Sequence, residues 1–370
     1  TMSKVKLLYI ITKCSKSGPI NVLNSIIDNL DRGLFEIYLI STSEEDSCRS
    51  MLEDFTRKVD HYQYIRLSPK DAVLGNIKKL KAAITQINPD VIHSTGVVPD
   101  LAVSRICPDK HMLVVHSNVM VDNVYLCGKL KGTMLAFLNL FLFRRAKCAV
   151  ACSKSLSDIY KKYGLNLPYI RNGVSVSQLH DIDKSELRKQ LGLPVDKTIY
   201  IYTASFNQRK NHSFLVKAFS QNGNQDAVLL LLGDGETFEK NKKIASGNNV
   251  IFVGRKSNVI PYLNASDYFI SSSLQEGMPM AVLEAMACGL PVLLSDIPQH
   301  EEIFELNHDV GCIFQNNSDR SLNDQIIALT EKNYDKMSRE AYDTVEKYFN
   351  AKVMGKQYQE LYIELAHKFR

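Results

Sequence analysis

One stretch, residues 271–296 (SSSLQEGMPMAVLEAMACGLPVLLSD), restricts the fold of this chain more than any other. The apolar run Tyr268–Ile270 leads into it and predicts a buried strand, and Met280–Cys288 is rich in residues that favour helices. Gly289 ends that helix, and Pro291–Leu294 predicts the next strand. A strand, turn, helix and strand in succession form the unit at which open α/β sheets bind ligands, beside the carboxyl ends of their strands.

Two glutamates of this stretch stand where a ligand would bind. Glu276 follows the predicted strand, and Glu284 lies on the predicted helix. Between them, the Gly277-Met278-Pro279 turn and the helix start can offer backbone N–H groups to anionic or hydroxyl-bearing ligands. Solvated surface charges are the simplest alternative, but a carboxylate before a glycine turn at the mouth of a sheet favours a functional role.

The stretch resembles the E-x7-E signature of the retaining family-four glycosyltransferases (glycosyl transferases group 1), which have the GT-B architecture. The resemblance covers essentially the whole chain and is strongest from Arg171 to Gly311. It implies an α/β fold with two Rossmann-like, doubly wound parallel-sheet domains that face each other across a cleft. The residues that carry the signature are Glu276, Gly277, Pro279, Glu284, Ala285, Gly289, Pro291 and Val292.

The length of the chain agrees with this organisation, because 370 residues exceed what one hydrophobic core usually supports. We expect an acceptor-side domain over residues 1–178 and a nucleotide-sugar domain over residues 179–351. A C-terminal helix over residues 352–370 would cross back to the first domain, as the resemblance implies.

Cysteine usage and charge restrict the cellular setting. Eight scattered cysteines without a C-x2-C pair favour a reducing cytosol, and we find neither a signal peptide nor an apolar run of transmembrane length. Residues 1–180 hold 24 Lys and Arg against 15 Asp and Glu, whereas residues 181–370 hold 21 against 25. A basic first half suits anionic lipid or an anionic acceptor. No nucleic-acid-binding motif accompanies it, so we expect no nucleic-acid partner.

Apolar runs alternate with segments of helical spacing along the chain, which predicts doubly wound sheets. The predicted strands outside the opening stretch are Val5–Ile11, Ile37–Ile40, Tyr62–Leu67, Val91–His93, His111–His116, Ala149–Ala151, Tyr169–Ile170, Thr198–Ala204, Ala227–Leu232 and Val250–Phe252. The predicted helices are Asn21–Leu30, Ala72–Ile87, Pro99–Ile106, Lys129–Lys147, Lys154–Tyr163, Glu186–Leu191 and, in the tail, a helical segment over 335–370.

The first strand leads into a turn-rich loop that ends at Gly18-Pro19. Rossmann-like domains approach phosphate at this position, and the family usually has two adjacent glycines there. Proline has no N–H, so one phosphate contact is lost in this chain. An ordinary loop and a loop that contacts the donor or acceptor through Gly18 both remain open.

His116 stands at the carboxyl end of the predicted strand His111–His116. A lone histidine is more often a structural residue than a functional one. The resemblance nevertheless implies a histidine at this strand end, where it hydrogen-bonds a hydroxyl of the transferred sugar. We therefore prefer His116 to His93 as the histidine of the site.

The segment Ser205–Asn211 follows the first strand of the predicted second domain and contains Arg209 and Lys210. Such a pair is usually a solvated surface feature, but arginine and lysine together suit a diphosphate. The resemblance implies that they bind the donor diphosphate, with Ser205 beside them. It further implies that Gly254 and Arg255 read the nucleobase, that Glu284 binds the ribose, and that Glu276 with the Gly277-Met278-Pro279 turn holds the hexose.

The segment Lys129–Lys147 is almost uninterruptedly apolar from Met134 to Phe143, with basic residues at both ends. It is too short to span a bilayer. It is either a core helix under the sheet or an interfacial helix that docks on an anionic membrane beside a lipid-linked acceptor.

These observations predict a retaining hexosyltransferase that uses a nucleotide sugar, with a UDP-sugar favoured, and a glycan or lipid-linked acceptor. Surface polysaccharide synthesis, as in lipopolysaccharide or capsule, would place it in the cytoplasm or peripherally on the inner face of the membrane. We expect no cofactor and no metal, since the only D-x-D triplet, Asp181–Asp183, lies in a linker. The alternatives are a GT-B sugar-nucleotide 2-epimerase and a non-catalytic binding subunit.

Overall fold

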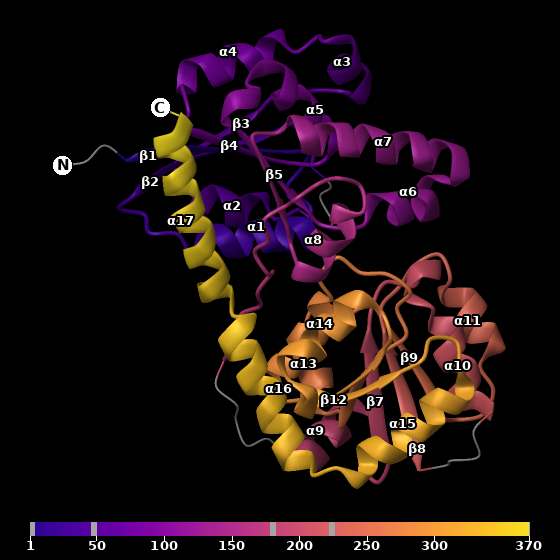
Figure 1. The fold of residues 1–370 in the computed structure, drawn as a ribbon. Coiled ribbons are helices and arrows are strands. Elements are labelled where there is room, and N and C mark those ends of the chain that lie inside the picture. Colours follow the sequence, from indigo (N-terminus) through magenta and orange to yellow (C-terminus); the bar gives the residue numbers. More distant parts are fainter. Residues whose placement is uncertain (1–3, 46–49, 178–182, 222–225, 370) are drawn as a thin grey trace. The chain divides into compact units, whose positions relative to one another are not determined.

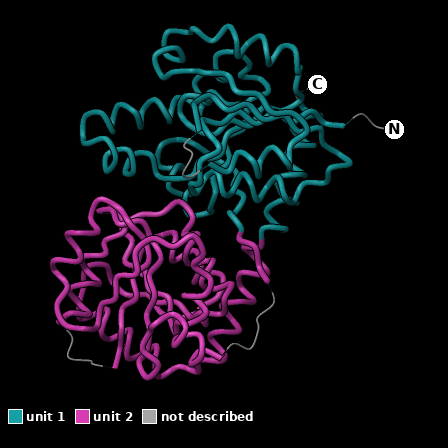
Figure 2. Tube along the Cα trace, turned by 180° about the vertical axis from the view of Figure 1, so that it is seen from behind, with its two compact units in different colours: residues 1–173, 351–370 teal, residues 174–350 magenta. Residues whose placement is uncertain are grey.

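The computed structural model describes residues 4–45, 50–177, 183–221 and 226–369. The chain forms two compact units, residues 1–173 with 351–370 and residues 174–350 (Figure 2). Each unit contains one six-stranded sheet with helices on both of its faces (Figure 1). This is the α/β architecture expected from the sequence. The predicted domain boundary at residue 178 lies outside the described residues.

The two sheets share one topology. The first has the strand order β3-β2-β1-β4-β5-β6 and the second has the order β12-β11-β10-β7-β8-β9, all parallel. Strand order therefore reverses between β1 and β4 in one sheet and between β7 and β10 in the other. The strands are β1 (Val5–Ile11), β2 (Phe35–Ser41), β3 (His61–Tyr64), β4 (Val91–Thr95), β5 (His111–Val115), β6 (Cys148–Ala151), β7 (Thr198–Thr203), β8 (Ala227–Leu232), β9 (Val250–Gly254), β10 (Tyr268–Ser271), β11 (Val292–Ser295) and β12 (Gly311–Phe314).

The helices are divided between the two units as follows. The first unit contains α1 (Gly18–Asp28), α2 (Leu52–Lys58), α3 (Pro69–Leu74), α4 (Lys78–Ile87), α5 (Val97–Ile106), α6 (Val119–Cys127), α7 (Lys129–Arg145), α8 (Lys154–Lys161) and α17 (Ala351–Phe369). The second contains α9 (Lys184–Leu191), α10 (His212–Gln221), α11 (Phe238–Ile244), α12 (Ile260–Asn264), α13 (Met280–Ala287), α14 (Pro298–Leu306), α15 (Asp319–Glu331) and α16 (Tyr334–Tyr348).

The last helix, α17, belongs to the first unit although α16, directly before it in the chain, belongs to the second. Its Tyr362 is buried against the first sheet, where its hydroxyl lies 3.3 Å from the Tyr9 hydroxyl and 2.8 Å from Nδ1 of His93. These contacts attach the end of the chain to β1 and β4.

The predicted helix Ala72–Ile87 is wrong, because the structure has two helices there, α3 and α4. Ser68 and Asp71 form a reciprocal capping box at the start of α3, and Gly75 ends it in the left-handed conformation with φ 77°. The apolar spacing of the sequence continues across this break, which concealed it.

Three further predictions differ from the structure. The strand predicted to reach Leu67 ends at Tyr64, where β3 leaves its partner β2, and Tyr169 makes only an isolated bridge with Ala151. Helix α1 begins at Gly18 instead of Asn21. Pro19 therefore stands in the first turn, where a missing N–H costs nothing because that group has no partner inside the helix.

Candidate functional site

The candidate site lies where strand order reverses in the second sheet, between β7 and β10. Open α/β sheets bind ligands at such a point, beyond the carboxyl ends of the strands. The loop after β7 carries Arg209 and Lys210, and the loop after β10 carries Glu276. The sequence predicted all three residues, and the structure places them at one edge of one sheet.

One backbone and one side-chain hydrogen bond join these two loops. The N–H of Leu274 donates to the Arg209 carbonyl at 2.8 Å, and Nη1 of Arg209 donates to the Gln275 carbonyl at 3.0 Å. Asn207 caps the short 3₁₀ helix Gln208–Lys210 by accepting the Lys210 N–H at 3.1 Å. The Arg209 guanidinium and the Lys210 backbone are thus held in place before any ligand binds.

The Glu276 carboxylate receives donors from both loops. Its Oε1 accepts hydrogen bonds from Nζ of Lys210 and, at 2.6 Å, from the hydroxyl of Ser273, and its Oε2 lies 3.4 Å from Nη1 of Arg209. The side chain is only 7% exposed, against 15% for Lys210 and 25% for Arg209. Glu276 is therefore a buried anion with two cationic partners that remain partly accessible.

Burial raises the pKa of the Glu276 carboxyl, but the charges of Lys210 and Arg209 and the hydrogen bonds from Lys210 and Ser273 outweigh it, so that the pKa lies below its usual value. Glu276 is consequently ionised at neutral pH. A carboxylate offers about four lone-pair positions. Oε2, with one long contact, has the capacity to accept a ligand hydroxyl.

A second layer of polar residues supports the cluster. The Tyr202 hydroxyl lies 2.8 Å from Oγ of Ser273 and donates to the Lys210 carbonyl at 3.1 Å, while Ser295 on β11 donates to the Ser273 carbonyl at 2.7 Å. Sequence reasoning missed these residues. The run of serines at the end of β10 was the one signal available for Ser273.

His300 on α14 was also missed. It is fully buried, its Nδ1 lies 2.9 Å from the Ser295 carbonyl, and burial lowers its pKa to about 4 although the charge of Glu276 opposes the shift. A neutral imidazole therefore stands behind the carboxylate cluster and fixes the position of Ser295. His300 lies in the first turn of this helix, which begins at Pro298.

The turn after Glu276 leads directly into α13. Met278 is buried, Pro279 is the N-cap, and the N–H of Met280 donates to the Met278 carbonyl at 2.9 Å, so one of the N–H groups that we expected for a ligand is used inside the turn. Glu284 lies on α13 and is half-buried. Burial and, after it, the charge of Glu284 raise the pKa of Cys288 to about 11.

The other predicted donor residues lie on neighbouring loops at the same edge. Ser205 follows β7 and is exposed, whereas Gly254 ends β9 and Arg255 pairs with Asp234 at 3.8 Å. The loop after β8 lies very close to the loop after β7, since a Cβ on Gly233 would lie 1.9 Å from the Ala204 carbonyl oxygen. Only glycine permits this approach of the loops after β7 and β8.

The remaining two predicted site residues, His116 and Gly18, belong to the first unit. His116 directly follows β5 and is half-buried, and burial lowers its pKa to about 4, so the imidazole is neutral at pH 7. Gly18 is the exposed first residue of α1. His93, the less favoured histidine, is 2% exposed and its Nδ1 contacts Tyr362.

Comparison with known proteins identifies the family. A family model described as glycosyl transferases group 1 matches residues 183–345, and one described as Glycosyltransferase Family 4 matches residues 20–178. This chain belongs to the group 1 glycosyltransferases of GT-B architecture. The two models meet near the boundary between the compact units, so each unit corresponds to one of them.

The relatives of this glycosyltransferase have different functional names. It is 24% identical to N-acetyl-alpha-D-glucosaminyl L-malate synthase of Bacillus anthracis over 83% of this chain and 82% of the relative. It is 22% identical to the O-antigen biosynthesis glycosyltransferase WclY of Escherichia coli over 98% of this chain and 99% of the relative. The Anabaena protein HepE, solved in complex with UDP-glucose, superposes with a TM-score of 0.76 at 18% identity, over 97% and 99% of the two chains.

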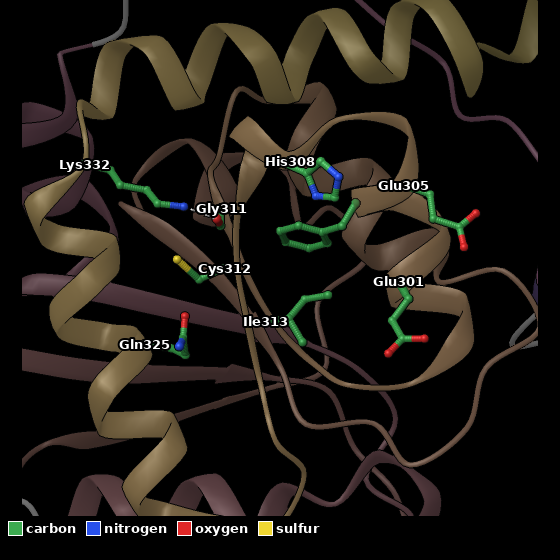
Figure 3. A pocket seen from close by; sticks show the side chains of 9 residues that line it. Glu301, Glu305, His308, Gly311, Cys312, Ile313, Gln325 and Lys332 are labelled. Atoms are coloured by element: carbon green, nitrogen blue, oxygen red, sulfur yellow. Dashed lines mark hydrogen bonds between the residues drawn. The ribbon is translucent and has the colours of Figure 1, made fainter.

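A separate cavity of about 500 Å³ also lies in the second unit of this glycosyltransferase (Figure 3). Gly311, Cys312 and Ile313 line it, and Nζ of Lys332 donates to the Gly311 carbonyl at 2.7 Å. These residues begin β12, and the strands are parallel, so the cavity is near the amino-terminal end of the strand. It is distinct from the carboxyl-end cluster around Glu276.

Within the described ranges, no group of three or more His, Cys, Asp or Glu is arranged to hold a metal ion. Of the D-x-D triplet, Asp181 and Ile182 lie outside those ranges. Asp183 is the N-cap of α9 and accepts the Glu186 N–H at 3.0 Å. None of the helices that the structure describes is long and apolar enough to cross a membrane.

Proposed function

We propose that this glycosyltransferase transfers a hexose, with retention of anomeric configuration, from a UDP-sugar to a glycan or lipid-linked acceptor in surface polysaccharide synthesis. The observation that carries the proposal is the cluster of Arg209, Lys210 and Glu276 where strand order reverses in the second sheet. The names of relatives support the finer assignments, since WclY acts in O-antigen biosynthesis and HepE was solved with UDP-glucose.

The basic pair supplies the main catalytic effect in this proposal. When the bond between the anomeric carbon and the diphosphate oxygen breaks, negative charge develops on the departing UDP. Arg209 and Lys210 are partly exposed and already fixed in place, so they stabilise this charge without reorganisation. A bidentate arginine and a compact lysine charge suit adjacent phosphate groups. The transfer accordingly needs no divalent metal.

Glu276 holds the sugar in this proposal and does not attack it. Its lowered pKa and its bonds to Lys210 and Ser273 make it a weak nucleophile, but an ionised oxygen accepts hexose hydroxyls. The acceptor oxygen then bonds to the anomeric carbon on the face that the diphosphate leaves, and its proton passes to a diphosphate oxygen. Glu284 binds the ribose, and the role of His116, a hydrogen bond to a sugar hydroxyl, stays a prediction from the resemblance.

The proposal includes a cytoplasmic location with peripheral attachment to the inner face of the membrane. The basic character of residues 1–180 is the sequence feature that supports it.

Incubation with a panel of nucleotide sugars tests the proposed activity. We expect free UDP to appear from one UDP-sugar, and the NMR coupling constant of the product should report the same anomeric configuration as the donor. A new sugar nucleotide without free UDP would identify a 2-epimerase, and no turnover of any donor would identify a binding subunit. A thermal-shift series across nucleoside diphosphates identifies the base, because a ligand at 100 times its Kd stabilises by about 2.7 kcal/mol.

A further inference from the structure

One face of α7 exposes large apolar side chains to solvent. Leu130 is 78% exposed, Met134 67%, Phe137 61% and Phe141 54%. They follow one another at intervals of four, three and four residues, which places all of them on the same side of a helix. Such a continuous stripe differs from the single exposed apolar residues that any protein surface carries.

The opposite face of α7 is anchored in the first unit. Ala136, Leu140 and Phe143 are buried, and a Cβ on Gly132 would lie only 2.3 Å from the carbonyl oxygen of Asn123 on α6. Helices α6 and α7 therefore pack closely, and the exposed stripe belongs to a firmly held helix. The sequence left open a core helix and an interfacial helix. One face of α7 packs in the core of the first unit, and the other face has no partner among the described residues.

Two large apolar side chains near the end of α6 are also exposed. Leu126 is 81% exposed and Tyr125 46%, both close to Gly128, which separates the two helices. Figure 1 shows the turn between α6 and α7 at the end that projects beyond the first sheet, and Figure 2 shows the same projection from behind. We call this the α6–α7 surface, made of Tyr125, Leu126, Leu130, Met134, Phe137 and Phe141.

Basic residues stand at both ends of the stripe. Lys129 and Lys131 begin α7 and Arg144 and Arg145 end it, all four are exposed, and α7 contains no acidic residue. Hydrogen bonds from Arg144 to the Tyr163 carbonyl and from Arg145 to the Ser104 carbonyl, at 2.7 and 2.9 Å, fix the arginine heads beside the helix. An apolar stripe between cations of one sign is complementary to a bilayer that has anionic headgroups.

The charge pattern distinguishes the membrane from a second copy of this chain. In a two-fold dimer the same surface would meet itself, and the four cations at the ends of α7 would come close to those of the partner. No acidic side chain of α7 is present to compensate for them. Anionic lipid headgroups provide the opposite charge along the whole surface.

We propose that the α6–α7 surface inserts into the interface of an anionic bilayer, with its apolar side chains at the acyl boundary and its cations among the phosphates. The inference rests on the peripheral attachment that the proposed function includes, and it assigns that attachment to named residues. The donor site in the second unit is not part of this surface.

Flotation of the full chain with vesicles tests the inference. The parent protein should float with vesicles of phosphatidylglycerol and phosphatidylcholine and not with phosphatidylcholine alone. Phe137→Ser/Phe141→Ser should weaken binding at least tenfold. Lys129→Ser/Lys131→Ser should weaken it about fivefold per residue at low salt, the equivalent of about 1 kcal/mol each. The matched control is Val73→Ser/Leu74→Ser on α3, whose side chains are 58% and 71% exposed, and it should bind like the parent.

Three outcomes would overturn the inference. In the first, the parent fails to float with anionic vesicles. In the second, the Phe137→Ser/Phe141→Ser variant binds as well as the parent while its Tm is unchanged. In the third, sedimentation shows a dimer of the parent that this variant converts to a monomer, so that a second copy of the chain covers the surface. UDP-induced thermal shifts, measured without vesicles, separate the two proposals. Failure of the parent to respond to any nucleotide with flotation intact would reject the proposed donor and leave the membrane surface standing.

Discussion

The two units have the same strand order but different residues at the points where that order reverses. In the second unit, the loops after β7 and β10 bring Arg209, Lys210 and Glu276 into contact. In the first unit, the loop after β1 meets Gly96, whose Cβ, if present, would lie 2.6 Å from Oγ1 of Thr12. There the N–H of Cys14 donates to the carboxylate of Glu45 at 2.7 Å.

The difference shows that the strand order determines where in the sheet a ligand can bind, and that the loop residues determine which ligand groups are bound there. Backbone N–H groups after the first strand of such a sheet often face phosphate. In the first unit Cys14 gives its N–H to the protein's own carboxylate, whereas the second unit presents two cations at the equivalent position. We therefore expect the diphosphate at the second unit. A role for Gly18 in donor binding stays a prediction.

The largest expected effect comes from removing both cations. Arg209→Ala/Lys210→Ala should lower turnover by about 10⁴-fold, because each preorganised donor to a developing charge contributes roughly 10² or more. The variant should also lose about 3 kcal/mol of unfolding free energy, since Glu276 is left as a buried charge without a cationic partner. Initial rates and urea denaturation measure the two effects.

The triple variant that adds Glu276→Gln separates stability from catalysis. A neutral amide removes the buried charge, so most of the lost unfolding free energy should return while turnover stays well below that of the Glu276→Gln single variant. If the triple variant turned over as fast as Glu276→Gln alone, the cations would have only a structural role, and the contrast between the two units would carry no functional meaning.

The next prediction concerns the two glutamates. Glu276→Gln should lower turnover about 10²-fold with a small change in UDP affinity, because Glu276 contacts the sugar in our proposal. Glu284→Ala should weaken UDP binding by about 1–3 kcal/mol, the cost of losing a hydrogen bond to a charged group. Calorimetric titration with UDP and measurement of turnover, on both variants, test this division of roles between Glu276 and Glu284. Equal losses of UDP affinity in the two variants would contradict it.

A smaller loss of turnover is expected for His116, which belongs to the first unit. His116→Ala should lower turnover about tenfold with little change in unfolding free energy at pH 7. Its folded pKa of about 4 lies below the unfolded value of about 6.5, so the unfolded chain binds the additional proton as the pH falls. The contribution of neutral His116 to the free energy of unfolding is complete above pH 6.5 and is lost as the pH falls towards 4. At pH 5 this loss is at most about 2 kcal/mol.

Denaturation at pH 7 and pH 5 therefore gives a second readout for the same variant. His116→Ala lacks the titrating group and should lose less stability between these pH values than the parent. A variant that retained full turnover per folded molecule and lost stability at pH 7 would make His116 a structural residue.

The positions of Arg209, Lys210 and Glu276 after strand ends were predictable, because apolar strands that lead into polar loops can be recognised in the sequence. Their roles in donor binding stay predictions from the resemblance. The direct contact of Lys210 with Glu276 was not predictable, since it depends on β7 and β10 lying side by side although 64 residues separate the start of β10 from the end of β7 in the chain. The contributions of Tyr202, Ser295 and His300 depend on the same packing. Helix α7 is apolar on all sides, so its sequence could not show which face the first sheet covers.

The smallest expected effect is that of metal removal, and it tests whether the cations of the second unit suffice. A departing diphosphate needs positive charge nearby, which a bound metal or fixed protein groups can supply. Arg209 and Lys210 stand at the carboxyl edge of β7 in positions that suit this task. Initial rates in saturating EDTA should therefore equal those in its absence. Activity that disappeared in EDTA and returned with Mn²⁺ would show that the basic pair does not stabilise the leaving group alone, and that the charge difference between the two units is not the source of catalysis.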